Sequence, residues 1–340
     1  MFQNRRLFKE KHKIKLSRAQ LDEINVFKKK LESKEYTLEE IECECCKIND
    51  SIILSEYDRF GIPYKSNFCK NCGLVYTSPR LDQDSIIKFY NNQYRKIYIN
   101  TNQQDPLNFF LNNQIKRGKK IYALIEQNFK LNKPLNVLEV GCGMGGILQA
   151  FNQKKHRVKG VDYGSDYINY GKKKLNLNLF VGGIDDVEGK FDVIIYSHVF
   201  EHILDLKKEL FEIKKHLKKE GVLYIQVPGI LNLKKYRYDL NRYFQNAHNY
   251  NFSLNSLNNI LTLNGFEMIY GDETVEALFR VSNNTKSLIN DFDRINSEIK
   301  KLAHKRIGYI FSSEGFRIYL VEILKQLRLY TILRRIFKGH

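Results

Sequence analysis

Short apolar segments alternate with longer amphipathic segments between residues 135 and 281. The short segments are rich in Val, Ile, Leu and Phe, which predicts strands, and helices fit the intervals between them. The segments expected to be strands are Leu135–Val140, Val158–Asp162, Leu179–Gly182, Phe191–Tyr196, Val222–Val227, Glu267–Tyr270 and, running antiparallel, Val275–Val281. Strands that alternate with helices indicate an α/β fold with a mainly parallel sheet.

Amphipathic helices are expected within this region and on both sides of it. Ser17 and Gln20 form a capping-box pattern at the start of the first helix. Gly221 is expected to terminate the clearest helix of the α/β region. The segments expected to be helical are 17–32, 86–90, 115–129, 201–219 and much of 285–340.

Composition and charge narrow the class of protein. The 340 residues are 43% hydrophobic and 28% charged, which excludes overall disorder and allows about two domains. The formal net charge of +18 is concentrated at the ends, where residues 1–35 carry +6 and residues 301–340 carry +7. The residues between them are only mildly basic, so the charge indicates docking by the ends, or plain Lys-rich composition, more than a nucleic-acid channel. We find no apolar run long enough to span a membrane and no secretion signal, and expect a cytoplasmic protein.

Cysteines cluster near the N-terminus in a pattern typical of a metal site. Cys43 and Cys46 form one Cys-x-x-Cys knuckle, and Cys69 and Cys72 form another after 22 intervening residues. Two knuckles at this spacing predict a structural zinc ion with four thiolate ligands. Cys45 is a spare thiol that could exchange with a neighbour.

A glycine-rich loop follows the first predicted strand of the α/β region. Gly141 allows a tight turn, and Gly143 lets the backbone approach a ligand. Asp162 ends the next strand, where its carboxylate can accept hydrogen bonds from a ribose. Glu139 lies inside the first strand. The dinucleotide-binding fingerprint has no acidic residue at this position, whereas a carboxylate there suits a ligand with a charged amino-acid group. The loop alone would also fit a nicotinamide-dependent enzyme.

These features together resemble a class I S-adenosylmethionine (SAM)-dependent methyltransferase. The resemblance covers about residues 115–275, and its motifs occur in the expected order. They are the glycine loop, Asp162, Gly183-Ile184-Asp185-Asp186, Ser197-His198-Val199-Phe200-Glu201-His202, Val227-Pro228 and the segment that starts at Ala247-His248. The resemblance implies a Rossmann-like sheet of seven strands.

The resemblance also assigns residues to the cofactor. Glu139, Gly141 and Gly143 would hold the methionyl part, and Asp162 would hold the ribose. Ile184 and Asp185 would contact the adenine. The full set expected to bind SAM is Glu139, Gly141, Cys142, Gly143, Asp162, Tyr163, Ile184, Asp185 and Ser197.

Four residues are candidates for catalysis. His198, Glu201 and His202 follow the fourth predicted strand, and His248 follows the fifth. A helix that starts near residue 198 would bring the first three to one face. One interpretation is a general base, with His202 or His248 taking a proton from a hydroxyl. A second is a divalent metal site, since the pattern resembles Glu-x-x-Glu-His in ubiquinone-pathway and small-RNA 3′-end O-methyltransferases. His198 replaces the first Glu, which disfavours magnesium. The third is a structural role in closing the cofactor site.

The N-terminal module favours a sugar as the acceptor. The run from Phe68 to Tyr76, with Pro79-Arg80, resembles the zinc-binding unit that precedes methyltransferase domains in sugar and cell-surface polysaccharide pathways. C-methyltransferases of that group carry an additional C-terminal domain, for which this chain is too short, so we expect O-methylation of a nucleotide-sugar or glycan. The alternatives are an RNA methyltransferase, with nucleic acid less favoured as a partner, and a non-catalytic SAM-binding scaffold.

The sequence thus predicts five units. They are a basic helical leader at 1–40, a zinc-ribbon-like module at 41–80, a helical cover at 81–130, the methyltransferase domain at 131–284 and a basic helical extension at 285–340. Within the extension, Arg317–Lys338 is expected to form an amphipathic helix. Such a helix could lie on an anionic membrane, or pack on the protein or on a second copy in a homodimer.

Overall fold

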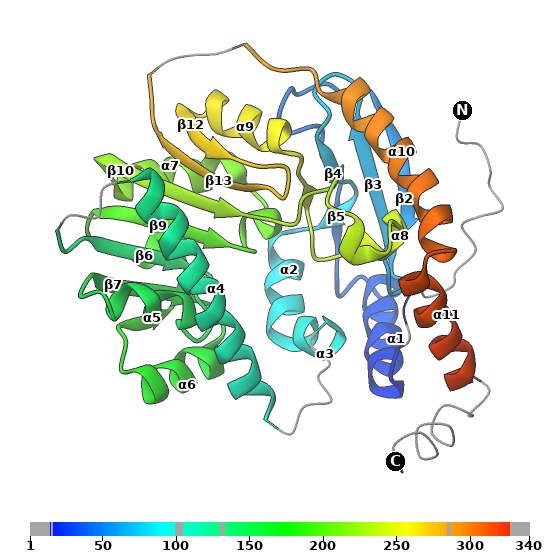
Figure 1. The fold of residues 1–340 in the computed structure, drawn as a ribbon, viewed down its shortest axis with the longest axis horizontal. Helices are drawn as coiled ribbons and strands as arrows, with labels where there is room; N and C mark the ends of the chain where they lie inside the picture. The colour runs from blue at the N-terminus through cyan, green and yellow to red at the C-terminus, as the bar shows by residue number, and fades with distance from the viewer. Residues whose placement is uncertain (1–13, 15, 99–104, 130–132, 284–286, 327–340) are drawn as a thin grey trace.

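The computed structural model describes residue 14 and residues 16–98, 105–129, 133–283 and 287–326. A seven-stranded sheet occupies one side of the molecule, and a smaller sheet built largely from the cysteine module lies beside it (Figure 1). The strands of the large sheet are β6 (Asn136–Val140), β7 (Arg157–Asp162), β8 (Leu179–Val181), β9 (Phe191–Ser197), β10 (Leu217–Gln226), β12 (Phe266–Gly271) and β13 (Glu276–Val281).

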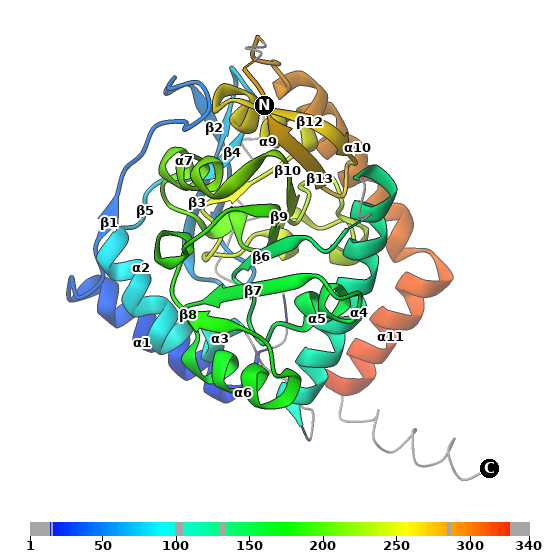
Figure 2. The same ribbon diagram turned by 90° about the vertical axis from the view of Figure 1, so that its left-hand side faces the viewer.

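The large sheet has the order β12-β13-β10-β9-β6-β7-β8 (Figure 2). The five strands from β10 to β8 are parallel, and β13 pairs antiparallel with both β10 and β12. This arrangement confirms the expected Rossmann-like α/β fold. The strand order reverses direction between β6 and β9, and in such sheets ligands bind at the carboxyl ends of the strands on either side of the reversal.

Alternating side chains divide the core into two layers. Val137, Val193 and Ile195 face one layer, whereas Leu138 and Ile194 face the other. The first layer is completed by α4 (Pro106–Asn128), α5 (Gly146–Asn152) and α6 (Ser165–Leu175). The second is completed by α7 (Leu206–His216), α9 (Leu254–Leu263) and the cysteine module. Residues on both faces are buried, as expected of parallel strands covered by helices.

The helix predicted at Glu201–Lys219 is shorter than expected. A 3₁₀ turn occupies Phe200–His202, and α7 begins only at Leu206, because the side chain of Asp205 caps it by accepting from the Lys208 amide at 2.9 Å. Gly221 does not terminate this helix, since it lies inside β10. The prediction that a helix from residue 198 aligns the catalytic candidates is therefore wrong.

The N-terminal part of the chain contains short helices around the module. Ser17 and Gln20 form the predicted capping box, and the first helix follows directly. The elements are α1 (Arg18–Glu32), β1 (Leu38–Glu39), β2 (Ser51–Tyr57), β3 (Pro63–Cys69), β4 (Val75–Thr77), β5 (Arg80–Leu81), α2 (Gln83–Phe89), a π-helical turn (Tyr90–Tyr94) and α3 (Arg95–Tyr98). Residues 1–13 of the predicted leader lie outside the described residues.

The small sheet joins the module to the larger domain. Its order is β11-β4-β3-β2, and β11 (Tyr250–Asn251) comes from the segment after β10. β11 pairs with β4 through Tyr250 opposite Tyr76. The Thr77 hydroxyl also donates to the His248 carbonyl at 2.8 Å. The segment between β10 and β11 contains a 3₁₀ turn (Lys234–Tyr236) and α8 (Leu240–Tyr243).

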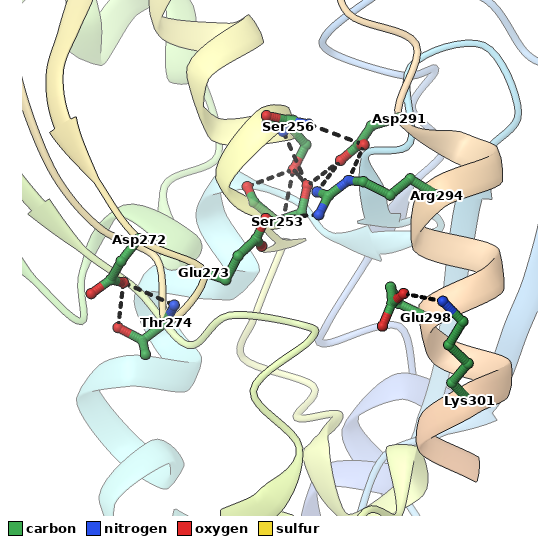
Figure 3. Close-up of polar contacts among 10 residues, drawn as sticks. Ser253, Ser256, Asp272, Glu273, Thr274, Asp291, Arg294, Glu298 and Lys301 are labelled. Atoms are coloured by element: carbon green, nitrogen blue, oxygen red, sulfur yellow. Dashed lines mark hydrogen bonds and ion pairs between the residues drawn. The ribbon is translucent and has the colours of Figure 1, made fainter. Parts of the chain in front are cut away.

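The first of the two C-terminal helices runs beside β2 and β3 of the module (Figure 1). The two helices are α10 (Phe292–Ile310) and α11 (Ser313–Gln326). Phe292 packs on Phe68 with ring centroids 4.6 Å apart. The buried Asp291 carboxylate accepts from Ser253 at the start of α9 and from Arg294 (Figure 3). These contacts tie the C-terminal extension to both the module and the methyltransferase region.

Only part of the predicted membrane-facing helix can be assessed. α11 ends at Gln326, and the rest of Arg317–Lys338 lies outside the described residues. Phe311 and Phe316, at the junction of α10 and α11, are 82% and 62% exposed. Within the described ranges, no helix has the combination of length and apolarity needed to cross a bilayer.

Candidate functional site

The glycine loop connects β6 to α5 at the point where the sheet order reverses. Gly141 and Gly143 have φ angles of 68° and 55°, which favour glycine over any residue with a side chain. A Cβ on Gly141 would lie 2.2 Å from a Val199 methyl group, so the loop packs directly against the segment after β9. The turn therefore has no room for a larger residue at this position.

The two carboxylates predicted beside the loop have different environments. Asp162, at the end of β7, accepts from the amides of Gly143 at 2.9 Å and Gly164 at 2.6 Å. A carboxylate has about four acceptor positions, so Asp162 can still accept from a ribose. Glu139 is 1% exposed, and its Oε2 atom has no hydrogen-bond partner in the described part of the chain. Burial, and secondarily Asp162, raises the pKa of Glu139 well above its usual value.

The environment of Glu139 fits the ammonium group of a SAM methionyl moiety. A buried carboxylate oxygen without a partner is destabilising, and a cation beside it would remove much of that cost. The glycine loop above it provides the close backbone approach that a bound nucleoside needs. The residues present thus suit SAM.

The remaining predicted cofactor residues differ in what they can contribute. The Cys142 side chain is buried, and its Sγ atom lies beside Gly160 and donates to the Gly143 carbonyl at 3.8 Å. Tyr163 is 73% exposed and its hydroxyl lies over Gly183. Ile184 is buried, whereas Asp185 is exposed and pairs with Lys208 at 2.8 Å. Ser197, at the end of β9, donates to Gln226 at 3.2 Å.

The helical cover contributes contacts that were not predicted from the sequence. The Gln114 amide brackets the glycine loop, because its Nε2 donates to the Cys142 carbonyl at 3.0 Å and its Oε1 accepts from the Met144 amide at 3.3 Å. The Arg95 guanidinium stacks on Tyr167, 3.9 Å from the ring centroid, and reaches the backbone beside Asp162. The cover thus lies directly on the loop.

Gly118 in α4 allows this close approach. A Cβ there would lie 2.6 Å from the Ile147 carbonyl oxygen in α5. A glycine inside a predicted helix was the available sequence signal. We expect Gly118→Ala to separate α4 from α5 and lower the free energy of unfolding by about 1–3 kcal/mol, measured by chemical denaturation.

Gly308 provides the matched control for this substitution. It is an exposed glycine inside α10, and no atom lies within 4 Å of the position that a Cβ would occupy there. Gly308→Ala should raise stability by about 0.5–1 kcal/mol through helix propensity alone. Equal effects of the two substitutions would contradict the proposed packing of α4 on α5.

The four catalytic candidates converge although no helix aligns them. The Glu201 Oε1 atom lies 3.7 Å from His198 Nδ1 and 3.8 Å from His202 Nε2. His248 reaches the group from the β10–β11 segment, with its ring centroid 4.9 Å from that of His202. His198 has a φ of 59° and is 32% exposed, whereas the Glu201 side chain is 2% exposed. Backbone turns after β9, and the pairing of β11 with β4 of the module, bring these four side chains together.

Hydrogen bonds and burial set the protonation states. His202 Nδ1 lies 2.7 Å from the Ala247 carbonyl and 2.8 Å from the Tyr90 hydroxyl. Burial alone would raise the pKa of Glu201, but His202, His198 and His248 lower it to about 2. Burial, together with His202, lowers the pKa of His248 to about 3, so this ring is neutral at pH 7.

The four predicted metal ligands of the module come together as expected from their spacing. The Sγ atoms of Cys43 and Cys72 are 3.4 Å apart, as are those of Cys46 and Cys69, and all four lie within 4.8 Å of one another. A tetrahedral zinc site with 2.3 Å bonds requires sulfur separations of about 3.8 Å. Hydrogen bonds with Cys69 and Cys72 raise the pKa of Cys43 well above its usual range, so a cation is needed for four thiolates to coexist. The donor set fits zinc.

Three basic side chains interact electrostatically with groups of the site, and this was not predicted from the sequence. Lys235 interacts with Glu201, Arg117 with Glu139, and Arg59 with His248. Arg59 comes from the module, Arg117 from α4 and Lys235 from the segment after β10. Burial and the neighbouring Arg117 and Arg59 lower the pKa of Lys235. None of the three pairs with a carboxylate among the described residues, although Arg59 donates to Gln245. These cations favour an anionic group nearby.

Comparison with known proteins identifies the central region. Residues 113–270 match the family model described as "Methyltransferase domain". A malonyl-[acyl-carrier protein] O-methyltransferase from Bacillus anthracis is 24% identical over 127 residues, which are 35% of this chain and 47% of that protein. The O-antigen chain terminator bifunctional methyltransferase/kinase WbdD from Escherichia coli is 33% identical over 87 residues, 22% of this chain and 12% of that protein.

Solved methyltransferase structures are similar to this chain at low sequence identity. The plantazolicin methyltransferase BpumL in complex with S-adenosylhomocysteine has a TM-score of 0.42 and 15% identity, and the match covers 66% of this chain and 93% of that one. The chain spans less than half the length of the curated relatives named above. From the family match, the seven-stranded sheet and the glycine loop, we conclude that residues 113–270 form a SAM-dependent methyltransferase domain of the class I fold.

Proposed function

We propose that this protein is a SAM-dependent O-methyltransferase whose acceptor is the hydroxyl group of an anionic sugar, as a nucleotide-sugar or a cell-surface glycan. The observation that carries the first part is the buried Glu139 carboxylate on the strand that leads into the glycine loop, because its Oε2 atom has no hydrogen-bond partner in the described part of the chain. It lies on β6, adjacent to β9, and Glu201 and His202 follow β9. Together with His198 and His248 they form what we call the Glu201–histidine group. Cofactor and acceptor groups therefore meet at one edge of the sheet.

Methyl transfer to a hydroxyl group requires that the acceptor oxygen is positioned against the methyl group and that the hydroxyl proton is removed. SAM supplies an activated methyl group, so the acceptor oxygen forms a bond to the methyl carbon as the carbon–sulfur bond breaks. The hydroxyl proton must then leave, and the Glu201–histidine group offers side chains that can accept it. His198 is its most exposed member and its Nδ1 atom faces Glu201, which orients the ring. The methylated acceptor and S-adenosylhomocysteine are the products.

Two observations support a sugar that carries phosphate or carboxylate. Lys235 acts electrostatically on Glu201, Arg117 on Glu139 and Arg59 on His248, and none of the three forms an ion pair with a carboxylate in the described part of the chain. Arginine is well suited to bidentate recognition of phosphate or carboxylate. The module also resembles the unit found in sugar pathways, and one relative is named for O-antigen chain termination. The malonyl-[acyl-carrier protein] O-methyltransferases act, by their names, on a different anionic acceptor.

Transfer of label from the cofactor tests this function. The purified full-length protein, incubated with methyl-labelled SAM and separate pools of nucleotide-sugars, lipid-linked glycans, malonyl-acyl-carrier protein and RNA, should label the nucleotide-sugars or glycans. Label confined to RNA or to malonyl-acyl-carrier protein would reject the sugar acceptor. Absence of SAM binding by calorimetry would reject the enzyme altogether and favour a scaffold.

A further inference from the structure

We propose that the junction of α10 and α11 binds the phosphate headgroup of an anionic phospholipid and inserts Phe311 and Phe316 into the membrane surface. A cavity of about 150 Å³ lies beside this junction, lined by residues of the α8 segment and of both C-terminal helices. None of its lining residues belongs to the cofactor or catalytic groups described above. The proposal therefore goes beyond methyl transfer and does not depend on the identity of the acceptor.

The lining of the cavity is positively charged. It includes Arg237, Arg242 and Arg306, and Asp239 is the only acidic residue among the described residues that line it. Asp239 Oδ2 lies 3.0 Å from Arg306 and 3.9 Å from Arg242, so one carboxylate is shared by two arginines. An excess of positive charge remains. Guanidinium groups suit the bidentate recognition of phosphate oxygens, so this lining favours a phosphate group as the ligand.

The rim of the cavity continues into an exposed apolar surface. Ile310 and Gly315 line the cavity, and Ile310 is also one of the exposed apolar side chains. Phe311 follows Ile310 directly, and Phe316 follows Gly315. The two helices meet in a tight turn, in which the Phe316 amide donates to the Ser312 carbonyl at 2.8 Å. A cavity suited to phosphate and an apolar surface thus adjoin each other, as a phospholipid at a membrane surface requires.

The apolar side chains of this turn are highly exposed. Phe311 is the most exposed of the large hydrophobic side chains in the described part of the chain, and Phe316 and Ile307 are 62% and 60% exposed. A contiguous exposed apolar surface marks a site of interaction with another molecule or with a membrane. Burial of these side chains in the interface of a bilayer would stabilise the bound state.

Charge favours a membrane over a second copy of this chain. In a two-fold symmetric dimer this surface would face its own copy and bring two positively charged cavities together. Lys305 and Arg317 add exposed positive charge on either side of the turn, and the segment 327–340 contains four Lys or Arg and no acidic residue. Basic residues close to an anionic bilayer strengthen binding.

This site differs from the membrane contact that the sequence suggested. The sequence offered Arg317–Lys338 as an amphipathic helix, with a membrane as one of three alternatives for its apolar face. The cavity and the turn lie mainly before that segment, and the arginines of the α8 segment come from a different part of the chain. Only the structure places them beside the exposed phenylalanines.

Vesicle binding of the full-length protein tests the site without an enzymatic assay. The protein would be floated with vesicles of phosphatidylcholine alone and with vesicles of phosphatidylcholine and phosphatidylglycerol in equal amounts. We expect binding to the anionic vesicles only, and added salt should weaken it. Phe311→Ser combined with Phe316→Ser should lower the partition coefficient by about 10-fold or more, because two apolar side chains no longer enter the interface. Arg237→Gln combined with Arg242→Gln should lower it by about 10-fold as well.

Two matched controls separate this site from general attraction to a basic protein. Phe211→Ser removes a phenylalanine that is 65% exposed in the lysine-rich helix α7, and it should leave vesicle binding unchanged. Lys173→Gln combined with Lys174→Gln removes two exposed charges from α6, and it should lower binding by less than about 2-fold. Circular dichroism verifies that each variant is folded.

Three results would overturn the proposal. An equal loss of binding in the site variants and in the controls would show diffuse adsorption of a basic protein. A dimer in sedimentation experiments that dissociates on Phe311→Ser with Phe316→Ser, without vesicle binding, would assign the surface to a second copy. Calorimetric binding of soluble glycerol phosphate without vesicle binding would assign the cavity to a free anion. All of these readouts are independent of methyl transfer, so a failure of the proposed function would not be mistaken for a failure of the membrane site.

Discussion

Replacing Cys43 and Cys72 together by serine is expected to unfold the module and to abolish methyl transfer. The four thiolates lie close enough to share one ion, and structural zinc contributes on the order of 10 kcal/mol in small domains. This is comparable to the whole stability of an ordinary domain. We expect loss of one zinc per chain and loss of amide-exchange protection throughout β2, β3 and β4.

The effect should extend to the catalytic cluster because the module holds part of it in place. β4 pairs with β11, and the Thr77 amide and hydroxyl bond to the carbonyls of Asn249 and His248. Without β4, the segment that carries His248 loses its partner strand. Methyl transfer should therefore fall by far more than SAM affinity, which depends on the glycine loop in the other core layer.

Cys45 provides the control for this experiment. It is 5% exposed and lies in the same module, but it is not one of the four clustered ligands. Cys45→Ser should keep the zinc content and most of the activity. A double variant at Cys43 and Cys72 that keeps its zinc and its activity would show that the cluster is not a structural metal site.

The class of fold could be predicted because local pattern determines it. Each predicted strand of the large sheet agrees with an observed strand to within a few residues, except that β10 starts at Leu217 instead of Val222. Burial on both faces makes these strands continuous apolar runs, which stand out from amphipathic helices. The helix ahead of β10 was predicted too long, because the residues before its capping residue, Asp205, also fit the helical period.

The arrangement of the site was harder to predict. Spacing identified the cysteine ligands and the glycine loop, because both depend on residues close together in the chain. Contacts between distant segments were missed, such as Gln114 on the glycine loop and Arg59 near His248. They depend on how the cover and the module dock, and docking leaves no periodic signal in the sequence.

The convergence of the histidines also depends on contacts that the sequence pattern does not reveal. These residues were correctly predicted to be neighbours. The prediction placed them on one face of an α-helix, however, and the structure has no α-helix there. A 3₁₀ turn and a left-handed His198 bring them together instead. His248 joins them only through β11, which could not be recognised as a strand of the module's sheet.

Replacing Glu139 by glutamine is expected to weaken SAM binding while it stabilises the protein without cofactor. The Glu139 carboxylate is buried with Oε2 unpartnered, and removal of one member of a buried charge pair costs about 2–5 kcal/mol. SAM affinity measured by calorimetry at pH 7.5 should therefore fall by about 30-fold or more. The matched control is Glu276→Gln, which changes a carboxylate bonded to Tyr224 on the same sheet and should leave SAM affinity unchanged.

The pH dependence follows from the raised pKa of Glu139. A carboxyl group whose pKa is higher in the folded than in the unfolded state contributes stability below its unfolded pKa, and that contribution is lost as the pH rises through the folded pKa. Asp162 strengthens this shift and Arg117 opposes it. Unfolding without SAM should thus show a decline in stability above the usual range for Glu, and Glu139→Gln should remove that decline.

SAM affinity should change with pH in the opposite direction. An ionised Glu139 attracts the ammonium group of the cofactor, so wild-type affinity should rise as the pH passes upward through the pKa of Glu139, and Glu139→Gln should abolish this part of the dependence. A variant that binds SAM as tightly as the wild type across this range would place the methionyl group elsewhere. Because stability and affinity move in opposite directions, a merely structural role for Glu139 cannot produce the expected pair of results.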